Sequence, residues 1–204
     1  MNIRRLAILL ALSLVIAGVA AADTYVVDKN HSEVGFRVRH FVTKVPGSFN
    51  QFSGTFNFTP EMVEIAKAGE VLENASVSFT IDASSIDTDQ PDRDNHLRSE
   101  DFFWVEKHPE ITFTSTKIQK VAGNRLDVTG TLTMRGVAKT ITLAADFLGV
   151  ATDNRGNGKA GFAATTRLNR KDFDFVWNSV LDHGGTVLGD EVSIEIDLEL
   201  NQQK

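Results

Sequence analysis

The sequence predicts an all-β protein of about eight antiparallel strands with one or two short helices. Apolar and polar residues alternate with a period of two over most of the chain, which is typical of strands with one apolar face. Hairpin signals separate these runs, and the strand–helix–strand rhythm of a parallel sheet is missing from the sequence. Such strands close into a barrel or stack as a sandwich. Strands longer than the usual 5–6 residues favour a tall barrel.

The alternation begins at Tyr25 and defines the first three strands. In residues 33–40 the odd-numbered positions are mostly polar or small, while Val34, Phe36, Val38 and His40 share the other face. We place a turn at Pro46-Gly47, a second strand over residues 52–58 and a third over residues 77–82.

Two segments break the alternation and predict helices. The first, residues 60–72, opens with Pro60 and predicts a short helical turn that ends near Gly69. The second, Asp82 to Phe103, is rich in Asp and Arg, and Pro91 suits the first turn of its helix. We expect this polar helix to cap one end of the sheet structure.

The second half of the chain returns to strands. His108-Pro109 restarts the sheet, and turns are expected at residues 122–124, 135–138 and 153–158, the last being the clearest hairpin signal. Residues 170–189 are irregular, with Phe173, Phe175 and Trp177 expected to be buried and Gly184-Gly185 expected to be flexible. Residues 192–200 alternate most regularly and predict the last strand.

Residues 1–22 have the composition of a signal peptide rather than of a folded segment. Arg4 and Arg5 precede an apolar run that is shorter than the roughly 20 residues of a membrane span. Ala20-Ala21-Ala22 supplies small residues for cleavage before Asp23. We therefore expect one domain over residues 23–204 that does not span a membrane after cleavage, in the periplasm or secreted.

Composition excludes several classes of function. The chain has no cysteine, which rules out thiol chemistry, thiolate metal sites and disulfides. Its formal charge is −6, and −8 once Arg4 and Arg5 are removed, which argues against nucleic acid as a partner. An apolar ligand remains compatible with this composition.

An ordered set of motifs resembles the YceI family. No single motif is specific, but the set runs in the family's order over essentially the whole chain after residue 22. The motifs are Asp28-x-x-His31-Ser32-x-Val34-x-Phe36, Ser85-Ile86-Asp87-Thr88, Arg93-Asp94-x-His96-Leu97-x-Ser99-x-Asp101-Phe102-Phe103, His108-Pro109 with Ile111-x-Phe113, Gly130-x-Leu132-x-Met134-Arg135-Gly136-Val137, Asn169-Arg170-x-Asp172-Phe173 and Gly189-Asp190-x-Val192.

The resemblance implies an extended, lipocalin-like barrel of eight antiparallel strands that holds a long apolar molecule. It also implies an exported bacterial protein associated with polyisoprenoids or other long-chain lipids, often as a homodimer. The segment from Pro60 to Asn74 is longer than the family pattern, and Trp104 stands where a small or acidic residue is expected.

The apolar faces of the strands are the candidate ligand-binding wall. Fourteen phenylalanines against one tyrosine favour a dry interior with few polar contacts. An eight-stranded barrel can be filled by its own side chains or hold one small ligand. The resemblance favours a cavity, lined by Val34, Phe36, Val38, Phe56, Val77, Phe79, Ile81, Leu126, Val128, Ile141, Leu143, Phe162, Ile194 and Ile196.

We expect no catalytic residues, no metal site and no cofactor. The sequence contains neither a GxSxG elbow nor an HExxH motif, and His31 and Ser32 point to opposite faces of an extended chain. His31, His108 and His183 are interpreted as turn residues. Asp87, Asp89, Asp92 and Asp94 lack the spacing of a calcium loop, and His40, His96 and His108 lack that of a metal site.

Arg93, His96 and Arg98 are possible contacts for a polar head group. Arg93 and His96 share a helix face, and two cations with an imidazole near a barrel mouth could hold a phosphate. The alternative, which we favour, is that Arg93 and Arg98 pair with neighbouring carboxylates and fix the polar helix.

The sequence thus predicts a non-catalytic periplasmic protein that binds a long-chain lipid or isoprenoid inside a β-barrel. The alternative hypothesis is a structural or stress-response barrel whose partner is another protein.

Overall fold

The computed structural model describes residues 22–179 and 186–204. The predicted signal peptide, except Ala22, and the pair Gly184-Gly185 lie outside the described residues, as does His183.

The described chain is built mainly of strands. The strands are β1 (Asp23–Val27), β2 (Glu33–His40), β3 (Thr43–Phe49), β4 (Phe52–Phe58), β5 (Ser76–Asp82), β6 (Ile86–Asp87), β7 (Glu110–Ala122), β8 (Arg125–Met134), β9 (Val137–Thr152), β10 (Gly158–Asn169) and β11 (Leu188–Gln202). The helices are α1 (Pro60–Ile65) and α2 (Pro91–Arg98), with 3-10 turns η1 (Lys29–His31), η2 (Ala83–Ser85) and η3 (Arg170–Phe173).

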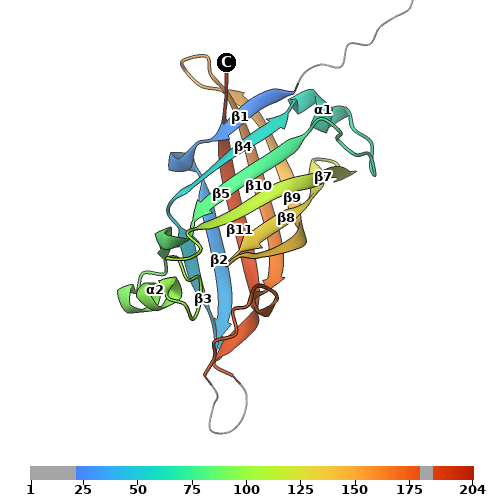
Figure 1. The fold of residues 1–204 in the computed structure, drawn as a ribbon. Helices are drawn as coiled ribbons and strands as arrows, with labels where there is room; N and C mark the ends of the chain where they lie inside the picture. The colour runs from blue at the N-terminus through green and yellow to red at the C-terminus, as the bar shows by residue number, and fades with distance from the viewer. Residues whose placement is uncertain (1–21, 180–185) are drawn as a thin grey trace, which may run out of the picture.

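Eight of these strands form a closed antiparallel barrel (Figure 1). Around the ring the order is β1, β4, β5, β7, β8, β9, β10 and β11, and β11 pairs with β1 to close it. The closing register places Tyr25 opposite Gln202 and Val27 opposite Leu200. The predicted eight-stranded all-β barrel is therefore confirmed.

The barrel wall continues past the ring at one end. After η1 the chain of β1 runs on as β2, which pairs with an earlier part of β11, from Leu188 to Asp197. Strand β3 pairs with β2, and the two-residue β6 pairs with β3 at Ser48 and Phe49. This extended end carries α2 and is the lower end in Figure 1.

The predicted turn at Pro46-Gly47 is wrong, because both residues lie inside β3. On one side of β3, Pro46 is opposite Arg37 of β2. On the other side, the strand pairing seen among the described residues is with β6, and it is limited to Ser48 and Phe49. The missing N–H of Pro46 is tolerated on such an open edge. Gly47 serves packing, since a Cβ there would lie 2.3 Å from Cζ of Phe36. The chain reverses instead at Phe41-Val42.

Helix α1 closes the other end of the barrel. The Thr59 hydroxyl accepts a hydrogen bond from the N–H of Met62 and caps the helix N-terminus. The helix ends at Ile65 rather than near Gly69, which adopts a φ of +85° in the loop that follows. Val63, on the inner face of the helix, is only 1% exposed, and the buried ammonium of Lys120 donates to its carbonyl.

The predicted polar helix is present as α2. Gln90 precedes it with extended backbone and Pro91 occupies its first turn. The helix has little hydrophobic surface of its own, and Asp94 is its buried residue. None of the described helices is both long and apolar enough to cross a bilayer.

Candidate ligand-binding cavity

The barrel encloses an elongated cavity of about 390 Å³. All fourteen residues of the predicted wall line it. They come from β2 (Val34, Phe36, Val38), β4 (Phe56), β5 (Val77, Phe79, Ile81), β8 (Leu126, Val128), β9 (Ile141, Leu143), β10 (Phe162) and β11 (Ile194, Ile196).

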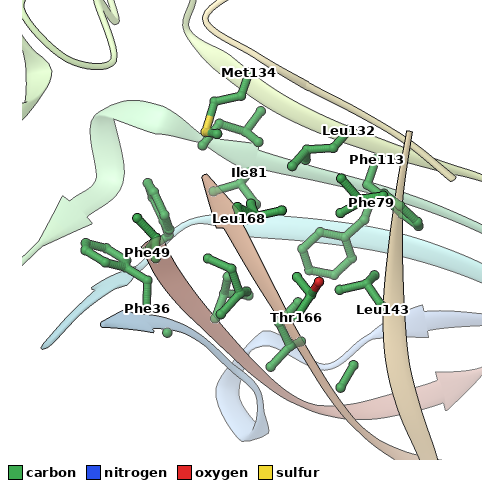
Figure 2. A pocket seen from close by; sticks show the side chains of 18 of the residues that line it. Phe36, Phe49, Phe79, Ile81, Phe113, Leu132, Met134, Leu143, Thr166 and Leu168 are labelled. Carbon is green, nitrogen blue, oxygen red and sulfur yellow. The ribbon is translucent and has the colours of Figure 1, made fainter. Parts of the chain in front are cut away.

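The wall offers few polar groups. Figure 2 shows Phe79, Phe113, Leu132 and Leu143 pointing into one space from different strands. The hydroxyl of Thr166 also faces this region, but it donates to the carbonyl oxygen of Thr142 at 2.9 Å. A ligand in the middle of the barrel therefore meets mainly hydrocarbon.

The cavity is closed at the α1 end. Phe58, Val63 and Leu72 line it there and are all less than 5% exposed. The Phe162 ring meets Phe58 edge-on at 5.3 Å and stacks on Phe56 at 6.1 Å between centroids. These rings form the floor of the cavity.

Within residues 22–179 and 186–204, the cavity opens at the extended end. There its walls come from the β2–β3 hairpin, α2 and residues 175–177, and His40 and Arg93 in this region are exposed. Val38, Val45 and Leu188 are half-buried, in contrast to the buried floor. We call this end, defined by Val38, His40, Val45, Arg93, His96, Trp177 and Leu188, the mouth.

Several wall residues were not assigned from the sequence. Ile111 and Phe113 alternate with Thr112 and Thr114, and Leu132 lies between two threonines, so this period of two was the available signal. Phe175 and Trp177 lie between η3 and β11, where no periodicity marks which side chains face inward.

Of the three possible head-group residues, two reach the mouth. Arg93 and His96 line the cavity and Arg98 does not. His96 Nε2 lies 3.0 Å from the carboxylate of Asp101. Its ring meets those of Phe102 and Trp177 edge-on, with centroids 5.0 and 4.9 Å away.

The two arginines are fixed by backbone carbonyls rather than by the carboxylates we expected. Arg93 donates to the Thr88 hydroxyl at 2.7 Å and to the Thr88 carbonyl at 2.6 Å. Arg98 donates to the carbonyls of Ser84 and Ile86, both at 2.7 Å. Short elements such as η2 and β6 leave carbonyls without ladder partners, and guanidinium groups satisfy them.

A buried arginine, Arg170, holds the segment of residues 175–177 in place at the mouth. Arg170 donates to the carbonyls of Gly189 at 2.9 Å and of Phe175 and Trp177 at 2.7 Å. Asp190 lies 3.4 Å away, but burial dominates and lowers the pKa of the Arg170 guanidinium from its usual value. Arg170 thereby ties residues 175–177 to the start of β11.

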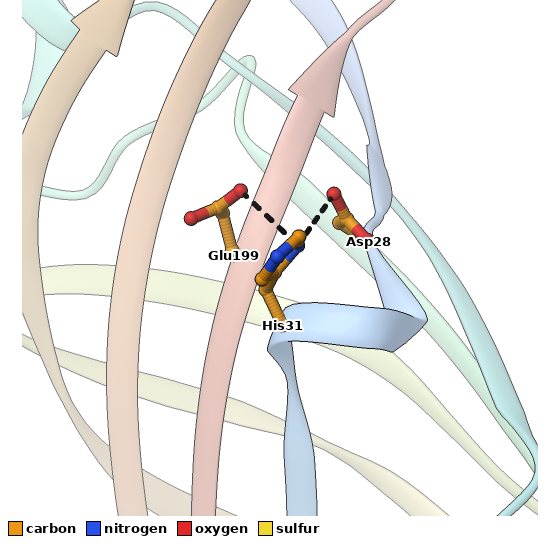
Figure 3. A group of neighbouring side chains, drawn as sticks. All are labelled: Asp28, His31 and Glu199. Carbon is orange, nitrogen blue, oxygen red and sulfur yellow. Dashed lines mark ion pairs between the residues drawn. The ribbon is translucent and has the colours of Figure 1, made fainter. Parts of the chain in front are cut away.

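Asp28, His31 and Glu199 form a cluster away from the cavity (Figure 3). His31 Nδ1 lies 3.2 Å from Asp28 and 3.8 Å from Glu199, in the local arrangement that we expected for His31. The Lys159 ammonium lies 2.9 Å from Asp28 and 2.8 Å from Glu199. Its hydrogen bond is the main reason that the pKa of Asp28 falls to about 2. Because an ammonium already bridges the two carboxylates, the group is an ion-pair cluster.

The Ser32 hydroxyl makes two hydrogen bonds with the backbone of Glu199. It donates to the Glu199 carbonyl at 3.3 Å and accepts from the Glu199 N–H at 3.0 Å, so it ties η1 to β11. Among the described residues, the trio of Asp28, His31 and Glu199 is the one arrangement with metal-ligand distances, and His40, His96 and His108 do not form another.

Barrel and cavity together define a class: antiparallel β-barrel proteins built around one long apolar cavity that opens at one end. The YceI-like domain model matches residues 25–200, and the chain belongs to the YceI-like family.

Relatives and solved structures agree with this assignment. The chain is 39% identical over 191 residues to protein YceI of Escherichia coli O157:H7, covering 92% of each chain. The structure of a Campylobacter jejuni YceI protein, 34% identical, superposes with a TM-score of 0.67 over 87% of this chain and 96% of that one. A domain from Saccharophagus degradans described as polyisoprenoid-binding has the same fold, with a TM-score of 0.63 at 16% identity over 88% of this chain and 98% of that one.

Proposed function

We propose that the protein binds and carries a long apolar molecule, a polyisoprenoid or similar long-chain lipid, in its barrel and does so in the periplasm without catalysis. The observation that carries this proposal is the long cavity with a hydrocarbon wall, a closed floor and an open mouth.

The dimensions of the cavity favour a chain-like ligand. Its volume lies within the roughly 300–1,000 Å³ of small-molecule sites. Strand β10 has 12 residues, which rise about 40 Å and span roughly 30 Å of barrel height at a tilt of about 40°. A cavity this narrow and tall suits an extended tail better than a compact ring system.

The chemistry of the wall favours hydrocarbon. Affinity for a tail would come from apolar contact, at about 25 cal/mol per Å² removed from water. The polar groups gather at the mouth, where Arg93 and His96 lie beside the position a head group would take. The polyisoprenoid-binding description of the Saccharophagus degradans domain is consistent with a ligand of this kind.

Export is the second part of the proposal. It rests on the basic and apolar leader at residues 1–22, and the absence of cysteine means that folding there requires no disulfide.

Mass spectrometry of an organic extract tests the binding function. The protein is purified from the periplasmic fraction, extracted, and compared with an extract of a similarly prepared protein that lacks a lipid cavity. A long-chain lipid enriched in the first extract is the expected result. We also expect solvent-stripped protein to rebind a polyprenol and to return it with unchanged mass. An extract without lipid, together with failure to rebind the polyprenol, would overturn the proposal.

A further inference from the structure

The turn of the β2–β3 hairpin consists of two apolar residues, Phe41 and Val42, whose side chains are exposed rather than packed in the core. Phe41 is 46% exposed and Val42 is 95% exposed. Phe41 has a φ of +51°, a conformation that glycine or asparagine normally supplies in a two-residue hairpin turn. A bulky residue in this strained, exposed position is the kind of local exception that marks functional sites.

This hairpin tip, Phe41-Val42, stands at the cavity mouth. Val38, His40 and Val45 from the same hairpin line the cavity. The N–H of Phe41 donates to the Val187 carbonyl at 2.8 Å, so the tip is attached to the chain entering β11.

A second exposed apolar residue lies at the same end. Val176 is 70% exposed, and its neighbour Trp177 lines the mouth. Asn178 Nδ2 donates to the Leu188 carbonyl at 2.7 Å, which connects this segment to the same entry into β11. Two segments at this end of the barrel, the hairpin tip and the chain around Val176, thus expose apolar side chains beside the mouth.

The hairpin is cationic in an acidic protein. From Val34 to Pro60 the sequence has no Asp or Glu, while it carries Arg37, Arg39 and Lys44 in a chain of net charge −6. Arg37 lies 3.6 Å from the carboxylate of Glu195 on β11, so Arg39 and Lys44 are the two cations nearest the tip that the inference uses. Arg39 Nη1 donates to the Phe41 carbonyl at 2.8 Å, which holds a guanidinium at the tip. Asp190 lies within the field of Arg39, but it is already paired with Lys171 at 2.8 Å.

We infer that the hairpin tip docks on a bilayer that carries anionic head groups and presses the cavity mouth against it. Exposed apolar residues flanked by cations insert in this way at the interfacial region, with the cations on lipid phosphates. A docked mouth lets an apolar tail move between bilayer and cavity without exposing its surface to water. The movement of an apolar tail between bilayer and cavity rests on the proposed function, whereas the binding of the hairpin tip to a bilayer does not.

Sedimentation with vesicles tests the inference. The purified protein is mixed with vesicles of equal parts phosphatidylethanolamine and phosphatidylglycerol, or of phosphatidylcholine alone. We expect binding to the anionic vesicles that weakens with added salt. Val42→Asp should weaken it about tenfold, and Lys44→Gln about fivefold, as expected for losing one cation near an anionic surface.

Val150→Asp is the matched control. Val150 is 52% exposed on β9, near the β9–β10 hairpin at the opposite end of the barrel (Figure 1), and its replacement should leave vesicle binding unchanged. Circular dichroism verifies that each variant is folded. Docking would be overturned if Val42→Asp and Val150→Asp reduced vesicle binding equally, or if the wild-type protein did not bind anionic vesicles. The second result is also the one expected if the tip binds a protein partner instead of a bilayer.

The two proposals fail separately. Lipid in the organic extract without vesicle binding would remove the docking inference and leave the carrier function intact. Vesicle binding by a protein that neither contains nor rebinds lipid would remove the carrier function and leave docking.

Discussion

Phe79→Asp is the substitution that tests the cavity wall most directly. Phe79 lies within β5 and is 8% exposed. Its ring stacks on that of Phe52 with centroids 5.8 Å apart and meets that of Phe56 edge-on at 6.5 Å. Ser78, the preceding residue, is exposed on the outer face of the same strand.

The cost of this substitution is comparable with the stability of the whole domain. Removing a buried phenylalanine ring costs about 3–5 kcal/mol. An Asp among these rings is driven to its neutral form, and protonating a carboxyl of ordinary pKa about 3.9 at pH 7 costs roughly 4 kcal/mol. The total of about 7–9 kcal/mol falls within the 5–15 kcal/mol by which domains are stable. The variant must therefore unfold or admit water to the cavity, and either outcome expels the ligand.

Urea denaturation and mass spectrometry of the organic extract measure the two outcomes. Ser78→Asp should change the free energy of unfolding by no more than about 0.5 kcal/mol and retain lipid. Phe79→Leu keeps the wall apolar and should also retain lipid. If Phe79→Asp unfolds at the wild-type urea concentration and still carries a long-chain lipid, the assignment of inner and outer faces is refuted.

Three further predictions concern other parts of the chain. The periplasmic form should begin at Asp23, and N-terminal sequencing that finds Met1 retained would contradict the assigned leader. The pKa of Asp28, lowered chiefly by Lys159 from its ordinary value to about 2, gives stability that is complete above about pH 4 and is lost as the pH falls through about 2. At about 1.4 kcal/mol per pKa unit, this lowering of the pKa corresponds to about 2 kcal/mol of stability. Lys159→Met should therefore lose up to about 2 kcal/mol of unfolding free energy at pH 7, and its stability in urea should fall less on acidification than that of the wild type. An unchanged dependence of stability on pH would count against the pairing. Arg170→Met leaves three carbonyls without their donor and should lower the free energy of unfolding in urea by at least about 3 kcal/mol, whereas wild-type stability would show that the mouth is held in another way.

The strands could be predicted because the cavity imposes the same alternation everywhere. A wall with hydrocarbon inside and water outside requires an apolar residue at every second position, so Val34, Phe79 and Ile194 were assigned to the inside from period alone. The turn at Phe41-Val42 escaped detection for the opposite reason. Its residues are strand formers, while Pro46-Gly47, which has turn composition, lies on an edge strand.

The partners of the buried and half-buried arginines could not be read from local sequence. Arg93 and Arg98 stand among many carboxylates, yet their partners are carbonyls freed by irregular backbone around β6. Arg170 reaches Gly189, 19 residues away, across a segment with no periodic pattern. Such partners depend on where the chain turns, which composition does not specify.

The pairing of β1 with β11 has a consequence for the order of folding. Tyr25 lies opposite Gln202, so ring closure joins residues 177 positions apart. Until β11 pairs with β1, the first strand of the ring lacks one of its two neighbours, and the hydrocarbon wall faces water. The seam is thus the slow, non-local step of folding, and a chaperone that shields the wall until β11 arrives would protect the protein from aggregation.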